Sequence, residues 1–394
     1  MTITRSVAPR PDANRTARTA ANRTARTVRD GLAWRALSVW LGSRLAVALL
    51  SIGGAWELAG RPAGQVEGFL SRWDHWDVGL FRKVAEFGYA GYPQDYPDRG
   101  IEAFFPGLPV VLRVVHVVLP DWTAAGLAVS LVAGCVAAPA LARLADLDGV
   151  NGSRAVLYLV LSPYAVFLAA GYSESLFLAC ALPGWLAARR GHWRTAALLV
   201  AAAATVRVTG LFLACGLVVE YAVAHRGRPR PDAAWLAAPF AAVFAYVAYL
   251  HALTGDWLRW PHAQAAGWGR HLTAPLQALR TTYDAGNDPS QAAEYAWSWR
   301  AELLAVAVGL ALTGLLLARR RWGEATYIGL SVLSLASSTY YLSVARASLL
   351  WFPLWILLAQ QATRRAWVHT GYVAVAAPLM AVLTLTFTAG RWVG

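Results

Sequence analysis

Lysine is almost missing from this sequence, and charged residues of every kind are scarce. Lys83 is the only lysine, so arginine carries nearly all of the positive charge behind the formal net charge of +13 over 394 residues. Only 14% of the residues are charged and 57% are hydrophobic, whereas soluble domains carry about 25% charged residues. This composition excludes an ordinary soluble domain and indicates an integral membrane protein.

Cysteine is also rare, and its placement excludes two further classes. Cys135, Cys180 and Cys215 each lie within an apolar run and lack CxxC or CxxH spacing. They therefore predict neither a disulfide framework nor a cysteine-ligated metal site. The arginines stand between apolar runs rather than on one basic face. The net positive charge therefore does not indicate a nucleic-acid partner.

The first 30 residues differ from the rest of the chain because they are polar, basic and repetitive. The hexapeptide Asn-Arg-Thr-Ala-Arg-Thr occurs at 14–19 and again at 22–27. Such a composition predicts a disordered tail. Its arginines could contact anionic lipid headgroups, and a solvated tail is the alternative. We place this tail in the cytoplasm.

Long apolar runs occupy most of residues 31–394, which we interpret as one polytopic transmembrane domain. About 20 helical residues cross the roughly 30 Å hydrocarbon core of a bilayer. The predicted fold is an all-α integral membrane protein with eleven spans, at 34–55, 122–143, 154–170, 173–188, 195–206, 208–224, 233–252, 300–318, 324–343, 347–362 and 367–388.

Arginine clusters between these runs predict the orientation of the spans. Positive residues favour the cytoplasmic side, and clusters lie at 189–194, 226–230, 319–321 and 364–365. Consistent alternation places the N-terminus in the cytoplasm of a multi-pass plasma-membrane protein. The segments 56–121 and 254–299 then become outer, extracytoplasmic loops.

Two segments admit a second topology. The apolar stretch 103–119 contains Pro106 and Pro109, and charge parity favours a re-entrant or interfacial segment over a span. The run 195–224 is interrupted by Arg207. One long tilted span is the alternative there, but it would place the next arginine cluster outside, so we expect two short spans that meet near the outer face.

With this orientation, most of the polar residues of interest gather at the outer face. The candidates are Arg72, Trp73, Asp74, Trp76, Asp77, Glu102, Tyr172, Ser173, Glu174, Arg207 and Arg346. Charged residues near hydrocarbon are costly, so a functional pocket is the default interpretation.

Structural roles are the alternatives for several of these candidates. An ion pair with Arg72 is the structural alternative for Asp74, although such a pair would also hold a carboxylate ready at the membrane surface. Glu174 could pair with Arg207 only to fix helix packing. Trp73 and Trp76 could belong to an aromatic belt at the membrane surface. Arg207 and Arg346 could instead reach the lipid headgroups.

Four ordered motifs resemble those of a known family. They are Arg72-Trp73-Asp74 with Trp76 and Gly88-Tyr89, Ala103-Phe104-Phe105-Pro106 with Leu108-Pro109, the run 172–177, and Thr205-x-Arg207-x-Thr209-Gly210-Leu211. Together these motifs are similar to those of the class V GPI mannosyltransferase family (PIG-V-like). The bacterial relatives of this family are polytopic glycosyltransferases of the GT-C superfamily.

The resemblance implies a GT-C-like fold and an enzyme. The expected reaction moves mannose from a polyprenyl-phosphate mannose donor to a glycolipid or glycan acceptor outside the cytoplasm, with inversion at the anomeric carbon. The motif position implies that Asp74 is the general base. This chain departs from the family by carrying Asp77 where an aromatic residue is frequent, so Asp77 is the second candidate.

The remaining candidates suit the binding steps of such a reaction. Arg207 and Arg346 are expected to bind the donor phosphate, with Arg72, Tyr172, Ser173 and Glu174 around the phosphate and sugar. Trp73, Trp76 and Glu102 are expected to face the acceptor.

No cofactor is expected to be required, since no histidine spacing here predicts a metal site, although a divalent metal is compatible with the reaction. A lipid-linked sugar flippase or transporter, and a non-catalytic scaffold subunit, are the alternatives from other classes.

Overall fold

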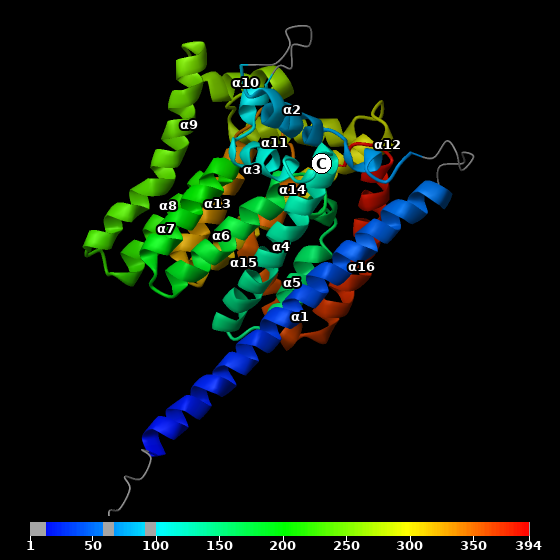
Figure 1. Cartoon of the computed structure of the whole chain (residues 1–394). Helices are drawn as coiled ribbons and strands as arrows, with labels where there is room; N and C mark the ends of the chain where they lie inside the picture. Colours follow the sequence, from blue (N-terminus) through cyan, green and yellow to red (C-terminus); the bar gives the residue numbers. More distant parts are fainter. Residues whose placement is uncertain (1–12, 58–66, 91–99, 394) are drawn as a thin grey trace, which may run out of the picture.

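A computed structural model describes residues 13–57, 67–90 and 100–393 of the chain, with the backbone alone for 13–30. Within these ranges the protein is a bundle of α-helices (Figure 1). Extended backbone pairs there only at an isolated antiparallel bridge between Leu272 and Ser338.

Five helices are long and apolar enough to cross a membrane. They lie at Gly31–Trp56 within α1 (Ala13–Glu57), and in α4 (Trp122–Leu147), η5 with α9 (Pro231–Ala237 and Ala238–Thr254), α12 (Ala293–Ala318) and α16 (Ala366–Thr388). Shorter helices fill the space between them, namely α5 (Gly152–Val160), α6 (Ser173–Arg189), α7 (Trp193–Val206), α8 (Thr209–Ala224), α13 (Trp322–Ala336) and α15 (Phe352–Arg364). The all-helical membrane fold is therefore confirmed, while eleven spans stay a prediction.

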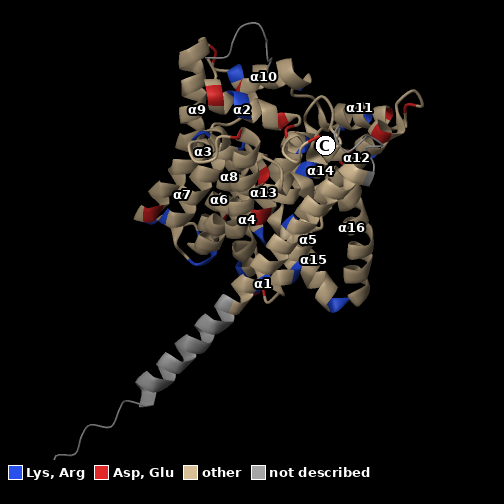
Figure 2. Ribbon diagram, turned by 45° about the vertical axis from the view of Figure 1, so that its right-hand side comes forward, with Lys and Arg blue, Asp and Glu red and all other residues tan. Residues whose placement is uncertain are grey.

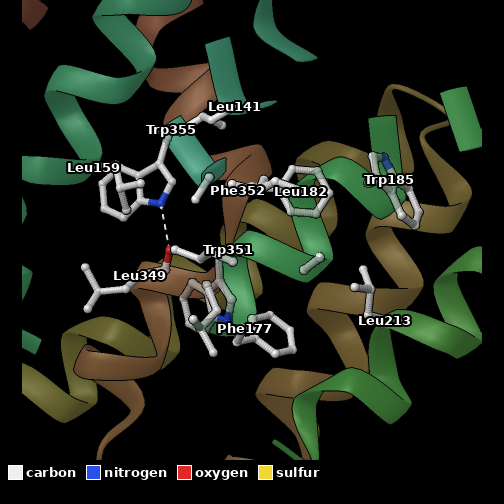
Figure 3. Packing of buried hydrophobic residues seen from close by; sticks show 14 of the residues in the cluster. Leu141, Leu159, Phe177, Leu182, Trp185, Leu213, Leu349, Trp351, Phe352 and Trp355 are labelled. Carbon is white, nitrogen blue, oxygen red and sulfur yellow. Dashed lines mark hydrogen bonds between the residues drawn. The ribbon is translucent and has the colours of Figure 1, made fainter. Parts of the chain in front are cut away.

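Small residues allow the inner helices to pack closely. A Cβ added to Gly216 of α8 would lie 2.5 Å from the carbonyl oxygen of Gly323 on α13, so only glycine fits at this crossing. Such small-residue contacts are typical of membrane helix pairs. Large aromatic side chains fill the rest of the core, where Trp351, Phe352 and Phe177 gather between α6 and α15 (Figure 3).

Short elements cover one end of the bundle and build the roof of the molecule (Figure 1). They come from the segment 67–121 and the segment 255–292, and from the link between α13 and α15. These elements are η2 (Ser71–Trp73), α2 (Asp77–Phe87), η3 (Ile101–Ala103), α3 (Gly107–His116), α10 (Arg259–Trp268), α11 (Pro275–Asn287), α14 (Val344–Ala347) and η6 (Ser348–Leu350).

The predicted re-entrant segment corresponds to α3. This helix has 10 residues, and about 15 Å of helix covers half of the hydrocarbon core. Its start packs against the end of α7, since a Cβ on Gly107 would lie 2.8 Å from the carbonyl oxygen of Thr205. A helix of this length does not cross the membrane by itself, and the re-entrant placement stays a prediction.

The break at Arg207 separates two helices that pack against each other. The backbone of Arg207 is extended (φ −152°, ψ 149°) between the end of α7 and the start of α8. The alternative of one long tilted span across 195–224 is therefore wrong.

Three predicted spans are interrupted in the structure. The segment 154–170 consists of α5, a turn containing Pro163, and the short helix η4 (Ala165–Leu168), because the residue before a proline disfavours helix. The segment 324–343 is helical only to Ala336, and 347–362 becomes a regular α-helix only from Phe352. The breaks leave residues 337–351 free to form an irregular link at the roof.

Two predicted boundaries also move. Helix α12 begins at Ala293, so the second outer loop ends before residue 299. Helix α1 extends back to Ala13, where a disordered tail is predicted, and Ala and Arg in the repeats are good helix formers. Residues 1–12 of the predicted tail lie outside the described residues.

The end of the bundle opposite the roof carries a network of ion pairs. Arg321 Nη2 lies 2.9 Å from Asp148 Oδ2, and Arg189 Nη2 lies 3.0 Å from Asp148 Oδ1. Glu324 binds Arg321 from the same helix α13. Two of the arginines assigned to the cytoplasmic side therefore also tie helices α4, α6 and α13 together.

Candidate active site

A cavity of about 340 Å³ opens beneath the roof. Its walls come from α2, the segment 103–105, the break between α7 and α8, the segment 260–272, and the segment 331–351. Charged residues occur along the ribbon near α2, α10 and α14 in this region (Figure 2). The cavity therefore lies where the sequence predicts the outer-face constellation.

A buried charge cluster forms one side of the cavity. Glu174, fully buried at the start of α6, accepts hydrogen bonds on Oε1 from Arg346 Nε at 2.6 Å and from Arg207 Nη1 at 2.8 Å. Arg346 Nη1 also donates to Asp77 Oδ2 at 3.0 Å, and Arg207 Nη1 donates to the Ser173 hydroxyl at 2.6 Å. Residues distant in sequence thus form one network, as the motifs predict.

The guanidinium group of Arg346 packs against two aromatic rings. Its guanidinium carbon lies 4.6 Å from the ring centre of Tyr172 and 4.7 Å from that of Phe167, within the range of cation–π attraction. Burial raises the pKa of the Tyr172 phenol, and the nearby Asp77 carboxylate adds to the effect. Tyr172 therefore stays protonated and supports the arginine as a neutral ring.

Glu302, which the motifs do not mark, holds the turn that carries Arg346. Its buried carboxylate accepts from the backbone N–H groups of Ser343 at 2.9 Å, Val344 at 2.7 Å and Ala345 at 3.1 Å. Ser343 has a positive φ of 60°, which is uncommon for a residue with a side chain. The turn therefore depends on Glu302 of the distant helix α12.

The two neighbouring aspartates have different surroundings. Asp77 lines the cavity. Asp74 lies outside the lining and pairs with Arg82, whose Nη1 is 2.6 Å from Asp74 Oδ2. The alternative of an ion pair between Arg72 and Asp74 is wrong, because Arg72 donates instead to the carbonyl oxygens of Ser51 and Glu67. Arg72 also lies outside the cavity lining.

The predicted acceptor-side residues separate in the structure. Trp73 is 2% exposed and packs against Phe387 of α16, so it has neither a belt position nor a cavity face. Trp76 is 45% exposed and makes an edge contact with Trp392, which lines the cavity. Glu102 binds the guanidinium of Arg259 through Oε1.

Sequence analysis also missed Arg270, a third arginine of the cavity lining. Arg270 lies in the second roof segment and donates from Nε to the Ser338 hydroxyl at 3.0 Å. Burial lowers its pKa, because the charged form loses hydration. In the sequence, Arg270 is marked only by its position in the predicted outer loop 254–299, and other arginines of the outer loops share this property.

Metal ligands do not gather at this site. Within residues 13–57, 67–90 and 100–393, no three His, Cys, Asp or Glu side chains form a group that could hold an ion. The expectation that no metal cofactor is required stays a prediction.

Comparison with known proteins agrees with the motifs. Residues 58–225 match the model of the mannosyltransferase (PIG-V) family. GPI alpha-1,6-mannosyltransferase 2 of Rattus norvegicus is 33% identical over 159 residues, which are 37% of this chain and 31% of that protein. The Homo sapiens protein of the same name is 34% identical over a region of the same length and coverage.

The match covers only part of each protein, since the chain spans 31% of the length of these curated relatives. It includes the buried Glu174, Arg207 and the Asp74–Asp77 turn. The predicted resemblance is thus confirmed: from residue 58 to residue 225, this chain is similar to the mannosyltransferase (PIG-V) family.

Proposed function

We propose that the protein is a membrane glycosyltransferase that moves mannose from polyprenyl-phosphate mannose to a hydroxyl group of a glycolipid or glycan acceptor. The observation that carries the proposal is a cavity at one end of a membrane helix bundle, lined by Asp77 together with Arg207, Arg270 and Arg346. A carboxylate and several cations are the groups that displacement of a phosphate from a sugar needs. The similarity to mannosyltransferases supports mannose as the sugar.

The reaction is a single displacement with inversion. The acceptor oxygen forms a bond to the anomeric carbon while the bond from that carbon to the phosphate oxygen breaks. The acceptor proton goes to a carboxylate, and the electron pair leaves with the prenyl phosphate. Asp77 is our first candidate for the base because it lines the cavity, whereas Asp74 is held by Arg82 outside the lining.

Arg207 and Arg346 both belong to the buried charge cluster, and the sequence suggested the contact of Arg207 with Glu174 but not the contacts of Arg346. Both are already bound to Glu174, and Arg346 also holds Asp77. Paired guanidinium groups keep free N–H donors for a sugar hydroxyl or a phosphate oxygen. We therefore assign them to orienting Asp77 and the sugar, with a contribution to the developing phosphate charge.

The proposed orientation puts the cavity outside the cytoplasm. The arginine clusters between α6 and α7 and between α12 and α13 lie at the bundle end opposite the roof, and such clusters favour the cytoplasm. We propose a plasma-membrane location in which the six shorter apolar segments complete eleven crossings. A membrane-impermeant maleimide should label Leu258→Cys, but not Arg228→Cys, in cells whose three native cysteines are replaced. The reverse pattern contradicts the orientation.

The decisive experiment measures transfer of radiolabelled mannose from polyprenyl-phosphate mannose by the purified protein, using lipid and glycan acceptors. We expect Asp77→Asn to lower kcat by about 10²-fold or more, and Asp74→Asn to lower it less. Asp284→Asn is the matched control, because this carboxylate is exposed on α11.

The two aspartate variants separate the candidates. A larger loss in Asp74→Asn than in Asp77→Asn would reverse the assignment of the base. Full activity in both variants would contradict acid–base catalysis by this turn. Movement of the labelled donor across a vesicle membrane without a covalent product would instead favour a flippase.

A further inference from the structure

The three arginines of the cavity differ in how their charge is balanced. Arg207 and Arg346 lie within 2.8 Å and 2.6 Å of Glu174, and Arg346 is also 3.0 Å from Asp77. Among the residues that the structure describes, Arg270 has only a hydroxyl partner, Ser338. Arg207 and Arg346 are thus each in direct contact with a carboxylate, whereas no carboxylate of the described residues lies within 4 Å of Arg270.

Tyr340 and Glu302 are the groups that favour the charged form of Arg270 through space. Glu302 acts on Arg270 through space, but both of its oxygens accept hydrogen bonds from the backbone of residues 343–345. Burial lowers the pKa of Arg270, and a buried charge without a partner is unfavourable. Binding of an anion next to Arg270 would therefore offset part of the unfavourable free energy of burying its charge.

A rigid backbone presents Arg270 to the cavity. The segment around it pairs with the link after α13, where Thr273 N donates to the Ser337 carbonyl at 2.9 Å and Leu272 forms a bridge with Ser338. The backbone N–H of His271 donates to the Thr339 hydroxyl at 2.8 Å. Arg270 is thus held at a fixed position, as a specific anion-binding residue needs to be.

Hydroxyl groups and an apolar rim flank this arginine. Ser334, Ser337 and Ser338 line the same wall, and hydroxyls donate to phosphate oxygens. Leu272 also lines the cavity and is 92% exposed. On α11, which follows it, Leu276 and Leu279 are 57% and 41% exposed and share one helix face by their spacing of three.

We propose that Arg270 binds the phosphate of the prenyl-linked sugar donor, while Leu272 and the exposed face of α11 contact the first part of its prenyl chain. This inference rests on the proposed function. A sugar phosphodiester carries one negative charge, which can pair directly with Arg270 because no carboxylate of the described residues is in contact with it, and its apolar tail matches the rim. Arg270 then also stabilises the prenyl phosphate as it leaves.

Binding of short analogues tests the assignment without any transfer reaction. The full chain in detergent is titrated with farnesyl phosphate, farnesol and inorganic phosphate, and the dissociation constants follow from thermal shifts. For the parent protein we expect farnesyl phosphate to stabilise, and farnesol and inorganic phosphate to do so far less. Arg270→Gln should weaken farnesyl phosphate binding at least tenfold, about 1.4 kcal/mol, and leave farnesol unchanged.

Three further variants complete the test. Arg280→Gln removes a charge from an exposed position on α11 and should bind like the parent protein. Arg270→Lys keeps the charge without the fork geometry and should bind with intermediate affinity; it also serves if Arg270→Gln does not fold. Leu272→Asn should weaken farnesyl phosphate and leave inorganic phosphate unchanged.

The outcomes separate this inference from the proposed function. Unchanged farnesyl phosphate affinity in Arg270→Gln, or equal weakening in Arg280→Gln, overturns the phosphate assignment even if mannose transfer is observed. Equal stabilisation by farnesol and farnesyl phosphate overturns it as well. A specific loss in Arg270→Gln supports it even if no mannose is transferred, in which case the proposed function alone fails.

Discussion

Glu302→Gln tests whether a buried carboxylate on α12 holds the turn that carries Arg346. Glutamine has nearly the same shape as glutamate, but it offers one acceptor oxygen and places an NH2 donor where the second oxygen was. The carboxylate serves Ser343 through one oxygen and Val344 with Ala345 through the other. One glutamine oxygen cannot serve both groups.

The magnitude follows from this count. At least one buried N–H loses its acceptor, at a cost of about 1–3 kcal/mol, and the bonds that remain are made to a neutral oxygen. Bonds to a charged partner are roughly twice as strong as neutral ones. Together these losses amount to about 2–4 kcal/mol in the free energy of unfolding, most of it borne by the turn before Arg346.

The assay combines thermal unfolding in detergent with mannose transfer. We expect Glu302→Gln to lower the unfolding temperature and to reduce kcat by more than about tenfold, because displacement of Arg346 releases Asp77. Glu294→Gln is the matched control, since Glu294 lies on the same helix and its ion pair with Arg391 is long, at 3.4 Å, and exposed. Equal unfolding temperatures for the two variants would refute the reasoning, as would unchanged transfer in Glu302→Gln.

Three other predictions concern the same end of the bundle. Arg207→Ala leaves the buried Glu174 with one guanidinium partner and should cost about 3–5 kcal/mol in chemical unfolding, whereas a cost below 1 kcal/mol would mean that Arg346 suffices. Trp73→Ala should cost about 3–5 kcal/mol because Trp73 is a core residue, and Trp76→Ala should leave stability within about 1 kcal/mol while raising the acceptor KM; reversed stabilities would contradict the two burials. Transfer should survive EDTA, and activity that vanishes and returns with one divalent metal would contradict a metal-independent site.

Sequence patterns predicted the helical architecture where one physical rule dominates. Long apolar runs gave the five long helices, because hydrocarbon excludes unpaired backbone groups. Arg207 marked a real break because a charged residue interrupts an otherwise apolar run. The Glu174–Arg207 pair followed from the cost of burying either charge alone.

The interruptions inside apolar runs could not be predicted in the same way. Residues 337–343 carry no charge, yet the helix ends at Ala336. Their backbone is satisfied by tertiary partners, as when Tyr341 N donates to the Thr282 hydroxyl at 2.9 Å. Non-helical backbone at this depth depends on such partners, and neither the partners nor their distance along the chain appears in a local pattern.

Ion-pair partners were also mispredicted where proximity in sequence was the only guide. Asp74 forms an ion pair with Arg82 on α2, whereas the side chain of the nearby Arg72 donates hydrogen bonds to backbone carbonyl oxygens. Both arginines are close enough to Asp74 in the sequence to pair with it. Which of them does so depends on how η2 packs against the end of α1, and this packing cannot be read from the local sequence.

The cavity divides into two parts with different relationships to the mannosyltransferase family. Asp77, Glu174 and Arg207 lie inside the matched region 58–225, whereas Arg270 and Arg346 lie outside it. Glu302, which fixes Arg346, is outside it as well. Asp77 and Glu174 thus come from the part of the chain that matches the family, while two of the three cations come from the unmatched part. A carboxylate that accepts the acceptor proton must lie at one position relative to the acceptor hydroxyl. The phosphate of a lipid-linked donor, in contrast, can be bound by cations on several sides. We therefore expect that variants at Asp77 alter kcat for every donor, while variants at Arg270 alter the choice among donors that differ in their lipid phosphate.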